Sequence, residues 1–137
     1  MLLKGRKVVG GTAEGELVVS RKPLSFLGGV DPETGVVTDA ESDIKGQSIV
    51  GKILAFPRGK GSTVGSYVLY ALKKNGKGPK AIIVEEAETI VATGAIIAGI
   101  PMVQGIDVSR LKSGERVRVD ADRGEVEVLN GRPSGGG

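Results

Sequence analysis

The sequence of 137 residues contains no cysteine and no histidine. Without thiolates the chain cannot form disulfides or ligate an iron–sulfur cluster, and without either residue type it lacks the usual ligands of a zinc site. The same absences remove cysteine nucleophiles and imidazole general bases, the commonest catalytic groups. Any chemistry must therefore rest on Ser, Thr, Lys, Arg, Asp, Glu or Tyr, or on groups that a partner supplies.

Aromatic residues and long apolar runs are also scarce. Aromatics make up 3% of the chain, so it offers no platform for stacking nucleic-acid bases. The net charge is only +3, without a dense basic run, which argues against a nucleic-acid partner. No stretch approaches the roughly 18 apolar residues of a membrane span, and charge begins at Lys4, too early for a signal peptide. We expect a soluble, cytoplasmic protein that uses neither a membrane nor nucleic acid.

Apolar patterning predicts a single α/β domain over residues 1–130, followed by a flexible, glycine-rich tail at 131–137. Strands are predicted at 3–10 and 16–19 (paired as a hairpin or meander), 36–38, 49–56, 80–84 and 100–104. Helices are predicted from 63 or 64 to 74 and at 90–98, with a surface turn or one helical turn at 39–46 and a connector or short helical turn at 107–113. Residues 115–120 and 125–128 are predicted to form a terminal β-hairpin. This order predicts a β/β/α architecture in which β elements flank a central βαβ unit.

The segment 21–35 has neither a strand nor a helix period and is predicted to be a long loop. Its apolar residues Leu24, Phe26 and Leu27 predict docking onto the core rather than disorder. One interpretation is a simple lid over the core. The other is a contact with substrate or partner, in which Ser25 and the backbone amides of Gly28 and Gly29 act as donors.

The segment 56–67, Phe-Pro-Arg-Gly-Lys-Gly-Ser-Thr-Val-Gly-Ser-Tyr, joins a predicted strand to a predicted helix and resembles an anion-binding loop. It does not match the nucleotide-binding P-loop, because Gly61 separates Lys60 from Ser62. Ser62 stands where the helix is predicted to begin, so it is either an N-cap or a base. Nearby amides, the helix dipole and the two cations would favour its alkoxide.

We expect six residues of the two loops to bind substrate: Arg58, Lys60, Gly61, Ser25, Gly28 and Gly29. Both cations could instead be solvated charges, but their spacing by glycines favours a ligand site. The acidic run Glu85, Glu86 and Glu88 could form a metal site with oxygen ligands, but short acidic turns are usually solvated, and no metal site is expected on this chain.

Three long motifs, in this order, resemble the small subunit of the aconitase X family, most closely its archaeal phosphomevalonate dehydratase branch. They are Gly10-Gly11-Thr12-Ala13-Glu14-Gly15, Pro23-Leu24-Ser25-Phe26-Leu27-Gly28-Gly29-Val30-Asp31 and Gly59-Lys60-Gly61-Ser62-Thr63-Val64-Gly65-Ser66-Tyr67. The resemblance covers about Lys4 to Asn130. Many relatives carry a His-Pro pair where this chain reads Ser42-Asp43-Ile44, so that segment is given no catalytic weight.

The resemblance implies a swivelling domain like the mobile domain of aconitases, acting as a hydro-lyase subunit only together with a large subunit. That partner, in a heterodimer or larger assembly, would hold a 4Fe–4S cluster, and this chain would bind no cofactor. The implied reaction dehydrates (R)-5-phosphomevalonate, a phosphorylated hydroxy acid, to trans-anhydromevalonate 5-phosphate in a modified archaeal mevalonate pathway to isoprenoids. The family's catalytic serine, a proton acceptor, falls on Ser62.

Other interpretations compete with this one. A related branch of the family dehydrates cis-3-hydroxyproline, and a non-catalytic docking module would only close over a partner. The stretch 100–124 is also similar to phosphohistidine swivel domains, but these require a phosphorylated histidine, which this chain lacks.

Overall fold

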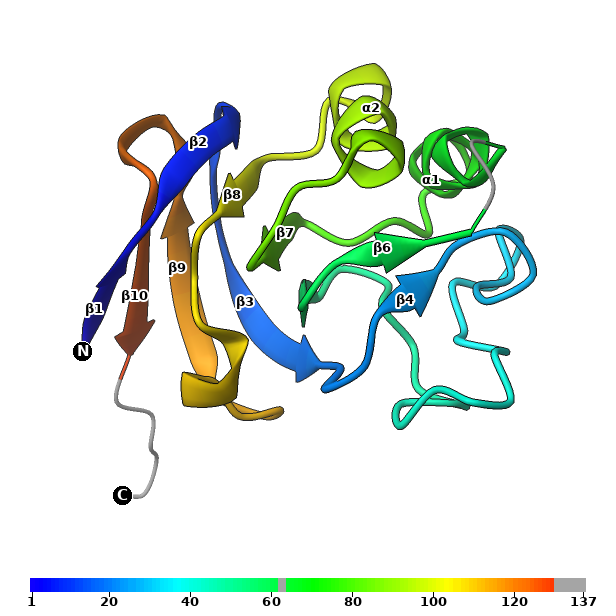
Figure 1. Cartoon of the computed structure of the whole chain (residues 1–137), viewed down its shortest axis with the longest axis horizontal. Helices are drawn as coiled ribbons and strands as arrows, with labels where there is room; N and C mark the ends of the chain where they lie inside the picture. Colours follow the sequence, from blue (N-terminus) through cyan, green and yellow to red (C-terminus); the bar gives the residue numbers. More distant parts are fainter. Residues whose placement is uncertain (62–63, 130–137) are drawn as a thin grey trace.

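The computed structural model describes residues 1–61 and 64–129. Within these residues the main element is one mixed sheet of eight strands with two helices on one side (Figure 1). Across the sheet the strands are β1 (Leu2–Lys4), β10 (Glu125–Leu129), β9 (Arg116–Asp120), β3 (Thr12–Val19), β5 (Ile53–Phe56), β7 (Ala81–Val84), β8 (Met102–Gln104) and β2 (Arg6–Val9). The predicted α/β class is therefore confirmed.

The sheet curls because its two edge strands, β1 and β2, are consecutive in the chain and separated only by Gly5. Gly5 donates its N–H to the Gly124 carbonyl at 2.7 Å, and a Cβ at Gly5 would clash with the Gln104 carbonyl oxygen. One aliphatic core fills the space between the two halves of the sheet, with side chains such as Leu17, Val103 and Val126.

The helices α1 (Gly65–Lys74) and α2 (Thr89–Ala98) form the crossovers between the parallel strands β5, β7 and β8. A second core lies between them and the sheet, and includes Phe56, Leu69 and Ile82. The helices approach closely where Gly94 meets α1, since a Cβ there would lie 3.2 Å from the Ser66 Cα. No helix in the described parts of the chain is both long and apolar enough to cross a membrane.

Several predicted elements are confirmed: the all-buried strand β7, the helix α2 that ends at Gly99, the short helical turn Val108–Arg110, and the terminal hairpin of β9 and β10. The predicted pairing of the first two strands is wrong. The segment 3–10 breaks at Gly5, after which β2 pairs with β8, while β3 pairs with β9 and β5. Position in the sheet, and not nearness in the sequence, decides these partners.

Three boundaries also differ from the predictions. The strand predicted at 49–56 begins only at Ile53, because a turn with a left-handed Gly51 precedes it. In the segment predicted as a strand at 36–38, Val36 and Val37 each form an isolated bridge, with Ser48 and Val30, and no strand is formed. The helix predicted to begin at 63 or 64 begins at Gly65, with Val64 as its N-cap. Ser62 itself and the predicted tail at 131–137 lie outside the described residues.

Candidate functional site

Two short strands bring the two candidate loops together. β4 (Leu24–Ser25) and β6 (Gly59–Lys60) pair in parallel, with Leu24 opposite Gly59 and Ser25 opposite Lys60 (Figure 1). The Leu24 N–H also donates to the Arg58 carbonyl at 3.0 Å. This pairing fixes the long loop beside the segment that follows β5.

The long loop docks onto the core as predicted, with one exception. Leu24 and Phe26 are buried, and the Phe26 ring packs edge-on against Phe56 with ring centroids 5.9 Å apart. Leu27 does not dock, because its side chain is 45% exposed. The apolar anchors therefore hold the loop in place while the segment from Leu27 to Gly29 stays near the surface.

The paired loops enclose a hollow of about 300 Å³. It is lined by Ser25, Leu27, Gly28, Gly29, Asp39, Lys60 and Gly61. Five of the six residues predicted to bind substrate thus lie in one place. Asp39 was not predicted as a site residue and lies in none of the three motifs, whereas Leu27 lies in the second motif but was predicted to dock onto the core. Asp39 reaches the hollow because its backbone N–H donates to the Gly29 carbonyl at 3.2 Å.

Glycine is required at two positions of the hollow, for a different structural reason at each. A Cβ at Gly29 would clash with the Ser25 carbonyl oxygen, so the loop closes only with glycine there. Gly61 has a φ of +101°, and a Cβ on it would lie 3.0 Å from the Ser25 Oγ. That hydroxyl donates to the Leu27 carbonyl at 3.1 Å. Close backbone approach therefore shapes the hollow.

The hollow offers donors to an anion. Among the described residues, the backbone N–H groups of Gly28 and Gly29 donate to no protein acceptor, and Lys60 makes no ion pair. The one carboxylate in the lining, that of Asp39, accepts a hydrogen bond from the Glu41 N–H at 3.0 Å. Exposed amides beside a cation are a common arrangement for binding phosphate or carboxylate.

Arg58, the sixth predicted residue, does not line this hollow. Its exposed guanidinium lies with Nε 3.4 Å from the Glu86 carboxylate, toward the acidic turn. The predicted catalytic residue, Ser62, follows Gly61 directly in the sequence but lies outside the described residues.

The segment 42–44 has a structural role. Asp43 accepts hydrogen bonds from the Ser20 hydroxyl at 3.0 Å and the Arg21 N–H at 2.9 Å, and Ile44 is buried. It borders a second hollow of about 570 Å³ that shares Lys60 with the first. Lys60 therefore stands between two adjoining depressions.

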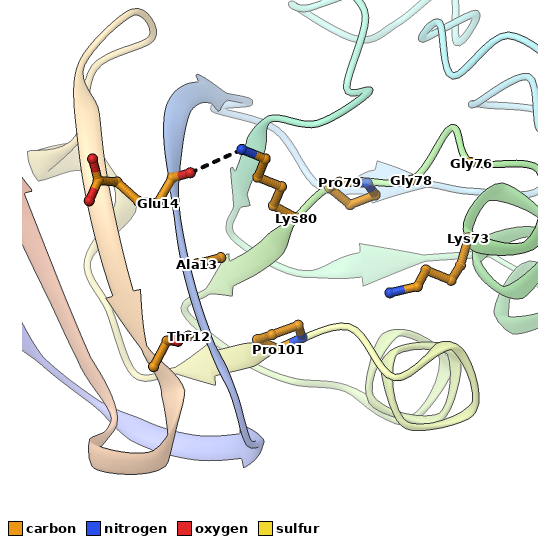
Figure 2. Close-up of a pocket in the computed structure, with 9 residues that line it drawn as sticks. All are labelled: Thr12, Ala13, Glu14, Lys73, Gly76, Gly78, Pro79, Lys80 and Pro101. Carbon is orange, nitrogen blue, oxygen red and sulfur yellow. Dashed lines mark hydrogen bonds between the residues drawn. The ribbon is translucent and has the colours of Figure 1, made fainter.

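Another hollow of about 570 Å³ lies near the opposite end of α1, at Lys73 and Gly76 (Figure 2). None of the predicted site residues lines it. Lys80 donates to the Glu14 carbonyl there at 3.3 Å, while the Glu14 carboxylate points away (Figure 2). Hydrogen bonds from Arg116 and Arg118 lower the pKa of that carboxylate.

Two carboxylates of the acidic run after β7 accept hydrogen bonds from backbone N–H groups. Glu88 caps α2 by accepting from the N–H groups of Ile90 and Val91, both at 2.8 Å. Glu85 accepts from the Val108 N–H at 3.2 Å. Within the described residues no group of three or more acidic side chains could hold a metal ion. With no cysteine anywhere in the sequence, the chain does not fit an iron–sulfur cluster either.

Comparisons with known proteins agree with this architecture. The phosphomevalonate dehydratase small subunit of Thermococcus gammatolerans is 86% identical over 131 residues, which are 96% of this chain and 100% of that one. The protein of the same name from Methanosarcina acetivorans is 53% identical over 136 residues, 97% of this chain and 93% of that one.

Among solved structures, the crystal structure of Thermococcus kodakaraensis aconitase X in its holo-form superposes with a TM-score of 0.94 at 81% identity. The superposed region covers 95% of this chain and 99% of the chain in that structure. The profile of the aconitase X swivel domain matches residues 2–128. The chain belongs to the aconitase X swivel domain family.

Proposed function

We propose that this chain is the small subunit of a hydro-lyase that dehydrates (R)-5-phosphomevalonate to trans-anhydromevalonate 5-phosphate, working with a large subunit. Highly similar chains carry the name phosphomevalonate dehydratase small subunit, which supports the activity and the partner. The observation that carries the proposal is the β4–β6 pairing. It joins five predicted anion-binding residues in one hollow that ends, in sequence, one residue before Ser62.

The hollow suits one anionic group of the substrate. The Lys60 ammonium and the amides of Gly28 and Gly29 supply positive potential for a phosphate or carboxylate, and among the described residues none of these three groups is taken up by a protein acceptor, although the Asp39 carboxylate also lines the hollow. Gly61 keeps the backbone close to the Ser25 hydroxyl, which holds the Leu27 carbonyl in place. Arg58 serves as an outer cation, beside the hollow rather than in it.

Ser62 is the proton acceptor in this proposal. Dehydration removes a proton from one carbon and a hydroxyl from its neighbour, so the reaction needs a base close to the bound substrate. A serine hydroxyl accepts that proton only where its alkoxide is stabilised. Lys60, two residues earlier in the sequence, is the cation to which the proposal assigns the stabilisation of that charge.

The iron–sulfur cluster implied by the family is assigned to the large subunit, because this chain has no thiolate to ligate it. The contribution of this chain is to bind the anion and to move the proton. The movement of the swivel domain over the partner, which would bring Ser62 to the substrate, is part of the proposal.

Reconstitution with the large subunit tests the function. The assembled enzyme is supplied with (R)-5-phosphomevalonate and, separately, with cis-3-hydroxyproline. We expect turnover of the phosphorylated substrate only.

Lys60→Met should raise the KM for that substrate at least about ten-fold, since one charged contact to an anion is lost. Lys45→Met, an exposed lysine outside the hollow, is the matched control and should leave KM unchanged. Turnover of cis-3-hydroxyproline alone, or equal KM values for both variants, would contradict the assignment.

A further inference from the structure

The helical side of the molecule exposes several large apolar side chains to solvent. Four large apolar side chains of α1 and α2 are exposed, as is that of the N-cap of α1, and we call these five residues the helical face: Val64, Tyr67, Tyr70, Ile96 and Ile97. Tyr67 is 65% exposed and Ile96 is 61% exposed. Both helices lie side by side on one side of the sheet (Figure 1), and their buried side chains belong to one core.

The sequence of α2 shows most clearly that this surface is apolar. Its ten residues, Thr-Ile-Val-Ala-Thr-Gly-Ala-Ile-Ile-Ala, contain no charged side chain. Four of them, Val91, Gly94, Ala95 and Ala98, are buried against the sheet and α1. A surface helix normally turns a charged or polar face to water, and a helix that is apolar all round is normally buried. The exposed Ile96 and Ile97 therefore indicate that this helix is covered in the working protein.

The opposite side of the molecule shows what this chain does with a surface that stays in water. There the outward residues of β3, β9 and β10 form a network of ion pairs, in which Glu14 contacts Arg116 and Arg118, and Arg118 contacts Glu127. Charged side chains of both signs keep that sheet solvated. The contrast between the two sides argues that the helical face is an interface and not an accident of composition.

The helical face is continuous with the candidate site. Val64 is the N-cap of α1 and comes three residues after Gly61. The start of α1 lies against the rim of the hollow, since a Cβ on Gly65 would be 3.6 Å from the Leu27 backbone nitrogen. A small depression of about 250 Å³ between the helices, lined in part by Tyr67, Ile90 and Thr93, continues the surface away from the hollow.

We infer that the helical face is the surface on which the large subunit docks. The inference rests on the proposed function, which requires the partner to complete the site at the hollow. A partner seated there meets Leu27 and Val64 first, and the adjoining apolar surface of α1 and α2 extends the contact. Tyrosines such as Tyr67 and Tyr70 are enriched among the anchor residues of protein interfaces.

Charge placed on this face tests the inference. Ile96→Lys and Ile97→Lys lie in the last turn of α2, where a cation suits the helix dipole, so these changes should not unfold the helix. Leu2→Lys is the matched control, because Leu2 is 49% exposed, close to the 46% of Ile97, but lies on β1, at the opposite edge of the molecule from the helices (Figure 1). Glu127 lies opposite Leu2 in the sheet and accommodates the new charge.

The dissociation constant for the large subunit is measured by titration calorimetry, with the thermal midpoint of each variant as a folding control. We expect the two isoleucine variants to bind at least about ten-fold more weakly, and Leu2→Lys to bind like the unmodified chain. Isoleucine variants that bind with unchanged affinity would overturn this inference alone. Self-association of the unmodified chain that these variants abolish, with binding to the large subunit intact, would assign the face to a second copy and also overturn it. An unmodified chain that does not bind the large subunit would overturn the proposed function, and this inference with it.

Discussion

At the scale of single residues, the backbone conformation of Gly61 decides how closely the chain approaches the Ser25 hydroxyl in the hollow. Gly61→Ala places a Cβ in a left-handed conformation and 3.0 Å from the Ser25 Oγ. The strain should cost about 1–2 kcal/mol in the free energy of unfolding. Because the Ser25 hydroxyl must shift, we expect kcat/KM of the assembled dehydratase to fall at least about ten-fold.

The control for this substitution is Gly46→Ala. Gly46 also has a positive φ, +88°, but a Cβ there would meet nothing within 4 Å. It should lose similar stability by urea unfolding and keep full activity. Equal activity in the two variants would show that the contact between Gly61 and Ser25 does not shape the substrate site.

Glu14 gives the clearest pH dependence. Hydrogen bonds from Arg116 and Arg118 lower its pKa in the folded state, so folding favours the carboxylate. This stability is present above the usual glutamate pKa and is lost as the pH falls through the lowered value of the folded state. Glu14→Gln should therefore be less stable than the unmodified chain at neutral pH, and the difference should shrink on acidification.

Urea unfolding at a series of pH values measures that difference. Glu33→Gln is the control, because the exposed Glu33 carboxylate makes no ion pair within the described residues. Its stability difference should be small at every pH. A Glu14→Gln difference that did not change with pH would show that the two arginines do not favour the charged form.

Which residues come together at the hollow was partly predictable from the sequence. The spacing of Arg58 and Lys60 by glycines, and the amides of Gly28 and Gly29, predicted a substrate site; the structure brings Lys60, Gly28 and Gly29 into one hollow, and their binding role stays a prediction. Asp39 could not be predicted, because only its backbone bond to the Gly29 carbonyl places it there. The ion pair of Arg58 with Glu86 was equally hidden, since it depends on how two turns meet in space.

At the scale of elements, the start of α2 depends on one side chain. Glu88→Ala removes both hydrogen bonds to the N–H groups of Ile90 and Val91. Loss of such a cap should lower the free energy of unfolding by about 0.5–2 kcal/mol. Glu86→Ala should change it by less than about 0.5 kcal/mol, because Glu86 makes only an exposed ion pair. Thermal or urea unfolding compares the two, and an equal loss would deny the capping role of Glu88.

Elements with a strong local signal were predictable, while pairings were not. The continuous apolar run of β7, the alternating hairpin of β9 and β10, and the stop of α2 at a left-handed Gly99 are all visible in the sequence. β2 and β3 look like a hairpin by the same logic, yet each pairs elsewhere. The two-residue strands β4 and β6 have no period to detect, although their pairing builds the site.

At the scale of the whole molecule, the curled sheet gives the chain two unlike sides. The sheet encloses its own aliphatic core, and the helices cover a second core on one side only. The outer sheet surface is charged and paired, whereas the helices present apolar side chains next to the hollow. This division lets one small domain stay solvated on one side and meet a partner on the side that holds its site.

The central claim is that this chain supplies the base of a two-subunit dehydratase. The most direct test is the rate of (R)-5-phosphomevalonate dehydration by the enzyme assembled with Ser62→Ala. Thr63→Val, which removes the neighbouring hydroxyl in the sequence, is the control. We predict that Ser62→Ala assembles normally and loses at least about 100-fold in kcat, while Thr63→Val stays within a few-fold of the unmodified enzyme. A Ser62→Ala enzyme that assembles and keeps its full rate would contradict the account.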